Sequence, residues 1–146
     1  MHLIAHRGNI DGANHESENN PEYILKAINS GFDCEIDLWL IGKDLLLGHD
    51  EPQYRIEETF LHDYKNKFWV HCKNLAALEF ITTRSGELNG FWHQNDDFTL
   101  TTRGYIWTYP NKPMGSNSVI VNLGPKNDEF NFPQIAGICS DFISSY

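Results

Sequence analysis

The stretch CEIDLWLIGKDLLLGHD, residues 34–50, decides the fold class because it combines the pattern of a buried strand with charged side chains. Its apolar residues predict a strand over 33–41, a tight turn at GKD and a return strand over LLLGHD. Glu35 and Asp37 nevertheless stand inside the first strand, and His49 ends the second. Residues two apart on a strand point to the same side, so the two carboxylates share one target.

The chain around this stretch alternates between apolar strand-like runs and amphipathic helical runs. Pro21 stands in a favourable first-turn position of a helix, and Gly31 is a stop signal for it. Up to residue 94 we expect strands over 2–6, 33–41, 68–72 and 90–94, and helices over 22–30, 56–64 and 75–85. Such alternation is typical of a parallel sheet with crossover helices, either open or closed into a barrel.

The rhythm changes after residue 94. Strand-like runs at 98–110, 118–123 and 136–143 are separated by loops without a helix of ordinary length. A parallel strand pair needs a crossover of about a dozen residues, and these gaps are at or below that length. We therefore expect some of these pairs to be antiparallel or joined by single turns.

Composition indicates one globular domain over 1–146, since 40% of the residues are hydrophobic and 13% are aromatic. The net charge of -9 argues against nucleic-acid binding, which needs a concentrated basic surface. We see no signal peptide and no apolar run of membrane-spanning length, so we expect a cytoplasmic protein. Cys34, Cys72 and Cys139 lie in apolar runs and are expected to be reduced and buried.

Polar side chains gather where the predicted strands end. They are His6, Arg7, Glu35, Asp37, His49, Asp50, His71 and Lys73. In a parallel α/β barrel such carboxyl ends converge on the face that carries the active site. Glu35 and Asp37 would repel each other unless a positive charge lies between them, and Mg²⁺ or Ca²⁺ with oxygen ligands fits best. The alternative is that both acids face solvent or form an ion network with Arg7 and Lys73.

These motifs together resemble the glycerophosphodiester phosphodiesterase family, within the barrel phosphodiesterases that include phosphatidylinositol phospholipase C. IAHRG at 4–8 resembles the opening histidine-arginine-glycine motif, and ENNP at 18–21 resembles the glutamate-asparagine motif. The segment 31–52 resembles the signature of two metal-binding acids followed by a histidine. GYIWTYP at 104–110 and AGICSDFI at 136–143 resemble the tryptophan-threonine strand and the closing strand. The resemblance runs along essentially the whole chain.

The resemblance implies an α/β fold, a reduced TIM-type (β/α) barrel with helices missing or shortened in the second half. It implies a metal-dependent phosphoric diester hydrolase of lipid metabolism, which releases an alcohol and a phosphomonoester such as glycerol phosphate. The roles that it implies are acid/base catalysis by His6 and His49, metal binding by Glu35 and Asp37, and phosphate binding by Arg7 and Lys73. The chemistry agrees, because imidazole exchanges protons near neutral pH and cations stabilise the charged transition state.

One departure concerns the third metal ligand, because His71 stands two residues before Lys73, where the family usually has an acid. His71 can ligate through a ring nitrogen, which suits Mn²⁺ or Zn²⁺ better than Ca²⁺. Alternatively, Glu18 or a water completes the shell. His93 is the other candidate at a strand end, although a hydrogen-bonded His is the simpler interpretation.

Two further residues have weaker assignments. Trp107 is most simply a core residue that can also line the pocket, and Asp141 ends the last strand, where it can orient a site residue.

The short chain also implies an open site for a small phosphodiester or a glycerophosphoryl-bearing substrate. Two other functions use the same residues: a lyase that forms a cyclic phosphate, and a phospho-ligand binding module without turnover. Dimerisation is one way to cover barrel edges that lack helices.

Overall fold

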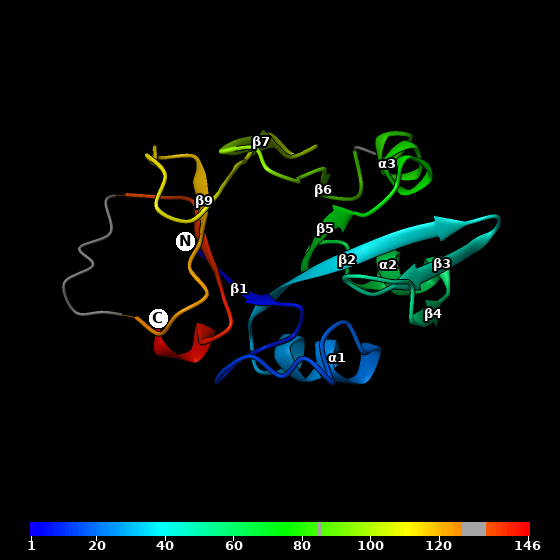
Figure 1. The fold of residues 1–146 in the computed structure, drawn as a ribbon, viewed down its shortest axis with the longest axis horizontal. Helices are drawn as coiled ribbons and strands as arrows, with labels where there is room; N and C mark the ends of the chain where they lie inside the picture. Colours follow the sequence, from blue (N-terminus) through cyan, green and yellow to red (C-terminus); the bar gives the residue numbers. More distant parts are fainter. Residues whose placement is uncertain (85, 127–133) are drawn as a thin grey trace.

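The computed structural model describes residues 1–84, 86–126 and 134–146, and its ten strands form one curled mixed sheet (Figure 1). The strands are β1 (His2–His6), β2 (Asp33–Ile41), β3 (Asp44–Leu47), β4 (Tyr54–Ile56), β5 (Phe68–Cys72), β6 (Gly90–Phe91), β7 (Phe98–Leu100), β8 (Ile106–Thr108), β9 (Ser118–Val121) and β10 (Gly137–Ser140). The helices are α1 (Pro21–Asn29), α2 (Glu58–Asp63), α3 (Leu75–Thr82) and the single 3₁₀ turn η1 (Ile143–Ser145).

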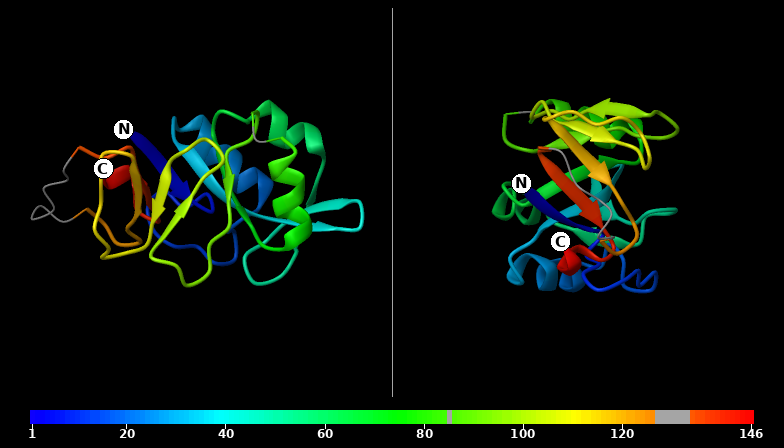
Figure 2. Two further views of the ribbon diagram at one scale, coloured as in Figure 1. Left: turned by 90° about the horizontal axis from the view of Figure 1, so that it is seen from above. Right: turned by 90° about the vertical axis from the view of Figure 1, so that its left-hand side faces the viewer.

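Strand β1 lies in the middle of the sheet, although it begins at residue 2. It pairs in parallel with β2 on one side and with β10 on the other, and Figure 2 shows β1 beside β10. Parallel pairing continues from β2 to β5 and β6, and from β10 to β9 and β8. The hairpin strand β3 is antiparallel to both β2 and β4, and the end strand β7 is antiparallel to β8. Eight strands therefore run in one direction, and β3 and β7 run in the other.

The predicted reduced TIM-type (β/α) barrel is wrong, because the sheet is a half-barrel without alternating helices. After β6 the only helical element in the described residues is the 3₁₀ turn η1, and β8 reaches its parallel partner β9 through the nine residues 109–117. So short a connection cannot form a crossover helix and still return to the sheet. The expectation of antiparallel or turn-joined pairs in this half is confirmed by β7 and β8.

The helices of the first half form where capping residues predict them. Asn20 caps α1 by accepting from the Glu22 amide, and Pro21 takes the first helical position. Asn74 caps α3 by accepting from the Ala77 amide. The predicted helix over 56–64 is confirmed in part, because its first residue belongs to β4 and α2 begins at Glu58.

The two faces of the curled sheet carry different residues, as the two-residue alternation of strands requires. The convex face packs against the helices and includes Ala5, Ile36 and Val70. The concave face holds the cluster Ile4, Trp69, Phe91, Trp107, Val119 and Cys139. Rings of non-neighbouring strands meet there, since Phe91 stacks on Trp107 at 4.4 Å between ring centroids. A cavity at the carboxyl end of the sheet can therefore open only above this aromatic layer.

Candidate functional site

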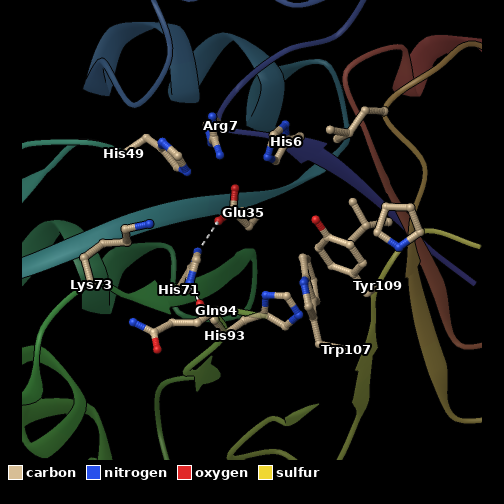
Figure 3. Close-up of a pocket in the computed structure, with 13 residues that line it drawn as sticks. His6, Arg7, Glu35, His49, His71, Lys73, His93, Gln94, Trp107 and Tyr109 are labelled. Atoms are coloured by element: carbon tan, nitrogen blue, oxygen red, sulfur yellow. Dashed lines mark hydrogen bonds and ion pairs between the residues drawn. The ribbon is translucent and has the colours of Figure 1, made fainter. Parts of the chain in front are cut away.

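A pocket of about 360 Å³ lies above the aromatic layer, at the carboxyl ends of the parallel strands (Figure 3). It is lined by His6, Arg7, Glu35, His49, His71, Lys73, His93, Gln94, Trp107, Tyr109, Pro110, Val121 and Leu123. Eight of the ten site residues proposed from sequence are in this set. The structure therefore gathers these eight residues, which come from six strands or strand ends, around one cavity.

The other two proposed residues, Asp37 and Glu18, lie just outside this lining. Asp37 is fully buried next to the pocket, and Glu18 lines an adjoining cavity of about 410 Å³. Arg7 and His49 line both cavities and so stand at their junction. Glu18 accepts hydrogen bonds from Arg7 Nη1 and Asn9 Nδ2, both at 3.0 Å. It therefore positions Arg7 and does not join the acids of β2.

A candidate metal centre forms where Glu35, Asp37 and His71 offer donor atoms that all lie within 4.8 Å of one another. His71 Nδ1 is 3.0 Å from Asp37 Oδ1 and 3.8 Å from Glu35 Oε1. Two ligands at about 2.1 Å from an ion and at right angles to each other are about 3.0 Å apart. The spacing therefore suits a small divalent cation, with His71 in place of Glu18 as the third donor.

The orientation of the His71 ring supports this arrangement. Its Nε2 lies 2.9 Å from the backbone oxygen of His93, which can only accept, so the Nε2 hydrogen points there. Nδ1 then faces the two carboxylates, and it needs either a proton or a cation between itself and their oxygens. A histidine ligand held by a carbonyl at its other nitrogen is the usual arrangement in metal sites.

Buried polar atoms without hydrogen bonds lie at this centre. Within the described residues they include Glu35 Oε2 and Asp37 Oδ1, and such oxygens have free capacity to bind a cation. Burial and the charge of Asp37 raise the pKa of Glu35. Burial alone would raise the pKa of Asp37 too, but His71, Arg7 and Lys73 outweigh burial and hold it well below its usual range. The residues therefore fit a divalent cation by donor type, spacing and unused capacity.

The alternative of an ion network holds in part. Arg7 Nε lies 3.1 Å and Lys73 Nζ 3.5 Å from different oxygens of Asp37, without hydrogen-bond geometry in either case. Asp37 therefore has cations beside it, whereas for Glu35 the described residues provide no partner at ion-pair distance except His71. Since Arg7 and Lys73 both line the pocket, they also present positive charge to a ligand there.

A tight turn after β1 places Arg7. Arg7 has φ 54° and Gly8 has φ 93°, both in the left-handed region. A Cβ at Gly8 would lie 2.8 Å from Tyr23 Cδ1, so only glycine lets α1 pack this closely. The histidine-arginine-glycine order therefore has a local reason: β1 ends, the chain reverses, and the guanidinium turns back over β2.

The two candidate acid/base histidines have different surroundings. His6 Nδ1 is 2.7 Å from buried Asp141, and His49 Nδ1 is 2.7 Å from exposed Asp50, so each ring leaves Nε2 for a ligand. Burial would lower the pKa of His6, but Asp141 and the charge of Glu35 outweigh it and raise the pKa. Burial and the charge of Arg7 lower the pKa of His49. The imidazoles thus favour opposite protonation states, which an acid/base pair requires.

Sequence reasoning missed several residues that the structure brings to the site, and three of them have roles that their contacts or position explain. The Asn19 amide accepts from the Asp37 backbone N–H and donates to Asp37 Oδ2, both at 2.9 Å. Asn9 bridges Glu18 and Asp141. Tyr109 lines the pocket, and a signal for it existed, because it stands two residues after Trp107 and so on the same face.

No protein-family model, no curated protein and no solved structure matches this chain. The family resemblance of the motifs therefore stays a prediction, and the site has to be interpreted from its own chemistry. None of the helices in the described residues has the length and apolar character needed to cross a membrane.

Proposed function

We propose that this protein is a metal-dependent phosphodiesterase that hydrolyses small phosphodiesters of the glycerophosphodiester type. The observation that carries the proposal is the convergence of two histidines and two cations in one pocket, next to three side chains whose donor atoms can bind one metal ion. A single pair of such residues can be explained by a structural ion pair or hydrogen bond. A phosphodiesterase site needs a proton donor, a proton acceptor, cations that bind phosphate, and metal ligands. Residues suited to all four roles are much less expected in one place by chance than a single pair is.

Arg7 and Lys73 would bind the non-bridging phosphate oxygens, since both ammonium and guanidinium groups reach the pocket beside Asp37. His6 and His49 flank that position, and one would take the proton of the attacking water while the other protonates the leaving oxygen. Asp141 holds the His6 ring so that Nε2 points to the pocket. A cation bound by Glu35, Asp37 and His71 would add positive charge that stabilises the transition state.

The mixed donor set of two carboxylates and one imidazole predicts a preference for Mn²⁺ or Zn²⁺ over Ca²⁺, because imidazole suits borderline metals. Replacing His71 with Asp would give an all-oxygen set and should shift the preference toward Mg²⁺ or Ca²⁺. Calorimetric titration of both proteins with the four ions measures this preference without any turnover.

Hydrolysis of glycerophosphocholine and of a chromogenic phosphodiester tests the function directly. Metal-stripped wild type, His6→Ala and the control His2→Ala are assayed with Mg²⁺, Ca²⁺, Mn²⁺ and Zn²⁺ in turn. We expect turnover that needs metal, is lost in His6→Ala and persists in His2→Ala. Phosphorus NMR of the products separates hydrolysis from formation of a cyclic phosphate. Folded protein that binds metal but turns over none of these substrates would instead support the binding module.

A further inference from the structure

The pocket has two chemically different walls. Its charged wall is formed by the residues of β1, β2 and β5 described above, and its other wall comes from β8, β9 and the segments that follow them (Figure 3). This second wall consists of Trp107, Tyr109, Pro110, Val121 and Leu123. The proposed chemistry uses none of these residues, so the wall needs a separate explanation.

Tyr109 and Leu123 are exposed although they are large and apolar, with 48% and 42% of their surface accessible. They stand together at the rim of the pocket, whereas Trp107 below them is 5% exposed. Isolated exposed apolar residues are ordinary, but two that face one cavity together with a proline ring form a surface that a ligand can cover.

The orientation of the Tyr109 ring is fixed by its neighbours in the protein. It stacks on His93 with 5.2 Å between ring centroids and 12° between ring planes. His93 Nε2 lies 2.7 Å from the Asp96 backbone oxygen, so the lower ring of this pair is fixed in turn. A ring fixed in this way loses little conformational freedom when a second flat ring stacks on it.

A phosphodiester has two ester groups, and the site offers them different surroundings. The adjoining cavity beyond Arg7 and His49 is polar, with Glu51 and Gln53 among its lining residues. The Tyr109 wall lies on the other side of the proposed phosphate position, next to His6 and Trp107 (Figure 3). The two ester groups would therefore lie in a polar and an aromatic environment respectively.

We infer that the preferred substrate carries a flat unsaturated ring on one ester group, and that this ring stacks on Tyr109. The inference rests on the proposed phosphodiesterase function and adds the class of substrate. An extended aliphatic chain fits less well, because the wall is a short aromatic ledge above a pocket of about 360 Å³, near the small end for ligand sites. The ring can belong to an aryl ester or to a nucleobase, since both present the same π face.

Calorimetry with phosphomonoesters tests the ring independently of turnover. Phenyl phosphate and cyclohexyl phosphate have the same connectivity, but only the first is flat, and adenosine monophosphate tests the nucleobase. In buffer with Mn²⁺ we expect wild type to bind phenyl phosphate about 10-fold tighter than cyclohexyl phosphate, as for base stacking on an aromatic side chain. The preference should disappear in Tyr109→Ala and persist in Tyr109→Phe.

Phe98→Ala is the matched control, because Phe98 is 45% exposed on the neighbouring strand β7 but does not line this pocket. It should keep the preference for phenyl phosphate. Equal affinities of wild type for the two phosphates, or a preference that survives Tyr109→Ala, would overturn the ring assignment. If glycerophosphocholine is still hydrolysed in that case, the phosphodiesterase proposal stands alone. If no phosphate binds and no ester is hydrolysed, both proposals fail.

Discussion

Strand β1 carries a histidine at each end, and both histidines contact an aspartate at the same distance. His6 Nδ1 is 2.7 Å from Asp141 at the pocket, and His2 Nδ1 is 2.7 Å from Asp33 at the opposite end of the strand. Asp33 also accepts from Lys67 Nζ at 3.0 Å. At this far end both Asp33 oxygens accept hydrogen bonds, whereas at the pocket end Glu35 Oε2 and Asp37 Oδ1 accept none within the described residues.

A histidine–aspartate pair is therefore by itself no sign of a functional site. What differs is the neighbourhood, because at the pocket end two carboxylate oxygens of adjacent acids, Glu35 Oε2 and Asp37 Oδ1, keep unused acceptor capacity. An unsatisfied buried acceptor costs stability, and two on adjacent carboxylates fit the proposed metal site. The far pair serves the fold and the near pair serves the proposed chemistry.

The largest expected contrast is in turnover. His6→Ala should lower kcat by about 100- to 10,000-fold, the range for loss of a general acid or base, and His2→Ala should leave kcat close to wild type. Steady-state hydrolysis by both purified variants, with circular dichroism as a check on folding, measures this. Equal losses in the two variants would remove the functional distinction between the two ends of β1.

The second largest expected effect is on metal affinity. Glu35→Gln should weaken Mn²⁺ or Zn²⁺ binding by about 100-fold, because a carboxylate donor becomes a neutral amide. In metal-free protein the same substitution should raise the free energy of unfolding by about 1 kcal/mol, since a buried unpaired charge is removed. Calorimetry and urea denaturation give the two quantities, and unchanged metal affinity would exclude Glu35 as a ligand.

Asp33→Asn should have the opposite effect on stability. It removes the charge that His2 and Lys67 share, so we expect the free energy of unfolding to fall by about 2 kcal/mol. Turnover per folded molecule should stay close to that of wild type. Urea denaturation of Asp33→Asn and Glu35→Gln in parallel measures both changes. The substitution at Asp33 should destabilise the protein, and the one at Glu35 should stabilise it. The same sign for both would contradict the comparison.

The smallest expected effect is a pH dependence of stability. Asp141 and Glu35 raise the pKa of His6 in the folded protein, so folding favours its protonated form. This contribution is complete below the ordinary histidine pKa of about 6.5 and is lost as pH rises through the raised value. Urea denaturation with a chelator from pH 5 to 9 should show this loss in wild type and not in His6→Gln.

Much of the first half could be predicted because its signals are local. The helices α1 and α3 follow from capping residues and Pro21, and the gathering of Glu35 and Asp37 follows from their spacing on one strand. The half-barrel could not be predicted, because it depends on which distant strands pair. The division of 98–108 into β7 and β8 around a turn had a local signal, Gly104, which has φ 83° there.

Residues of the site that were missed share a similar cause. Asn19 reaches Asp37 only because its own φ of 62° turns the chain there, and no pattern in 18–21 predicts that direction. The sequence does not decide whether His71 is a metal ligand or a hydrogen-bonded structural residue. The contact of its Nε2 with the His93 carbonyl turns Nδ1 toward the acids and so favours the ligand role. Side-chain direction at strand ends follows from tertiary contacts, which local patterns do not contain.

The position of β1 between β2 and β10 also has a consequence for synthesis on the ribosome. Residues 2–5 pair with residues 137–140, which are made more than a hundred residues later. Until then one edge of β1 has no strand to bind, and His6 has no aspartate. Such distant pairing slows folding and leaves an open strand edge for other chains to meet. We therefore expect the nascent chain to depend on chaperones until β10 has been made.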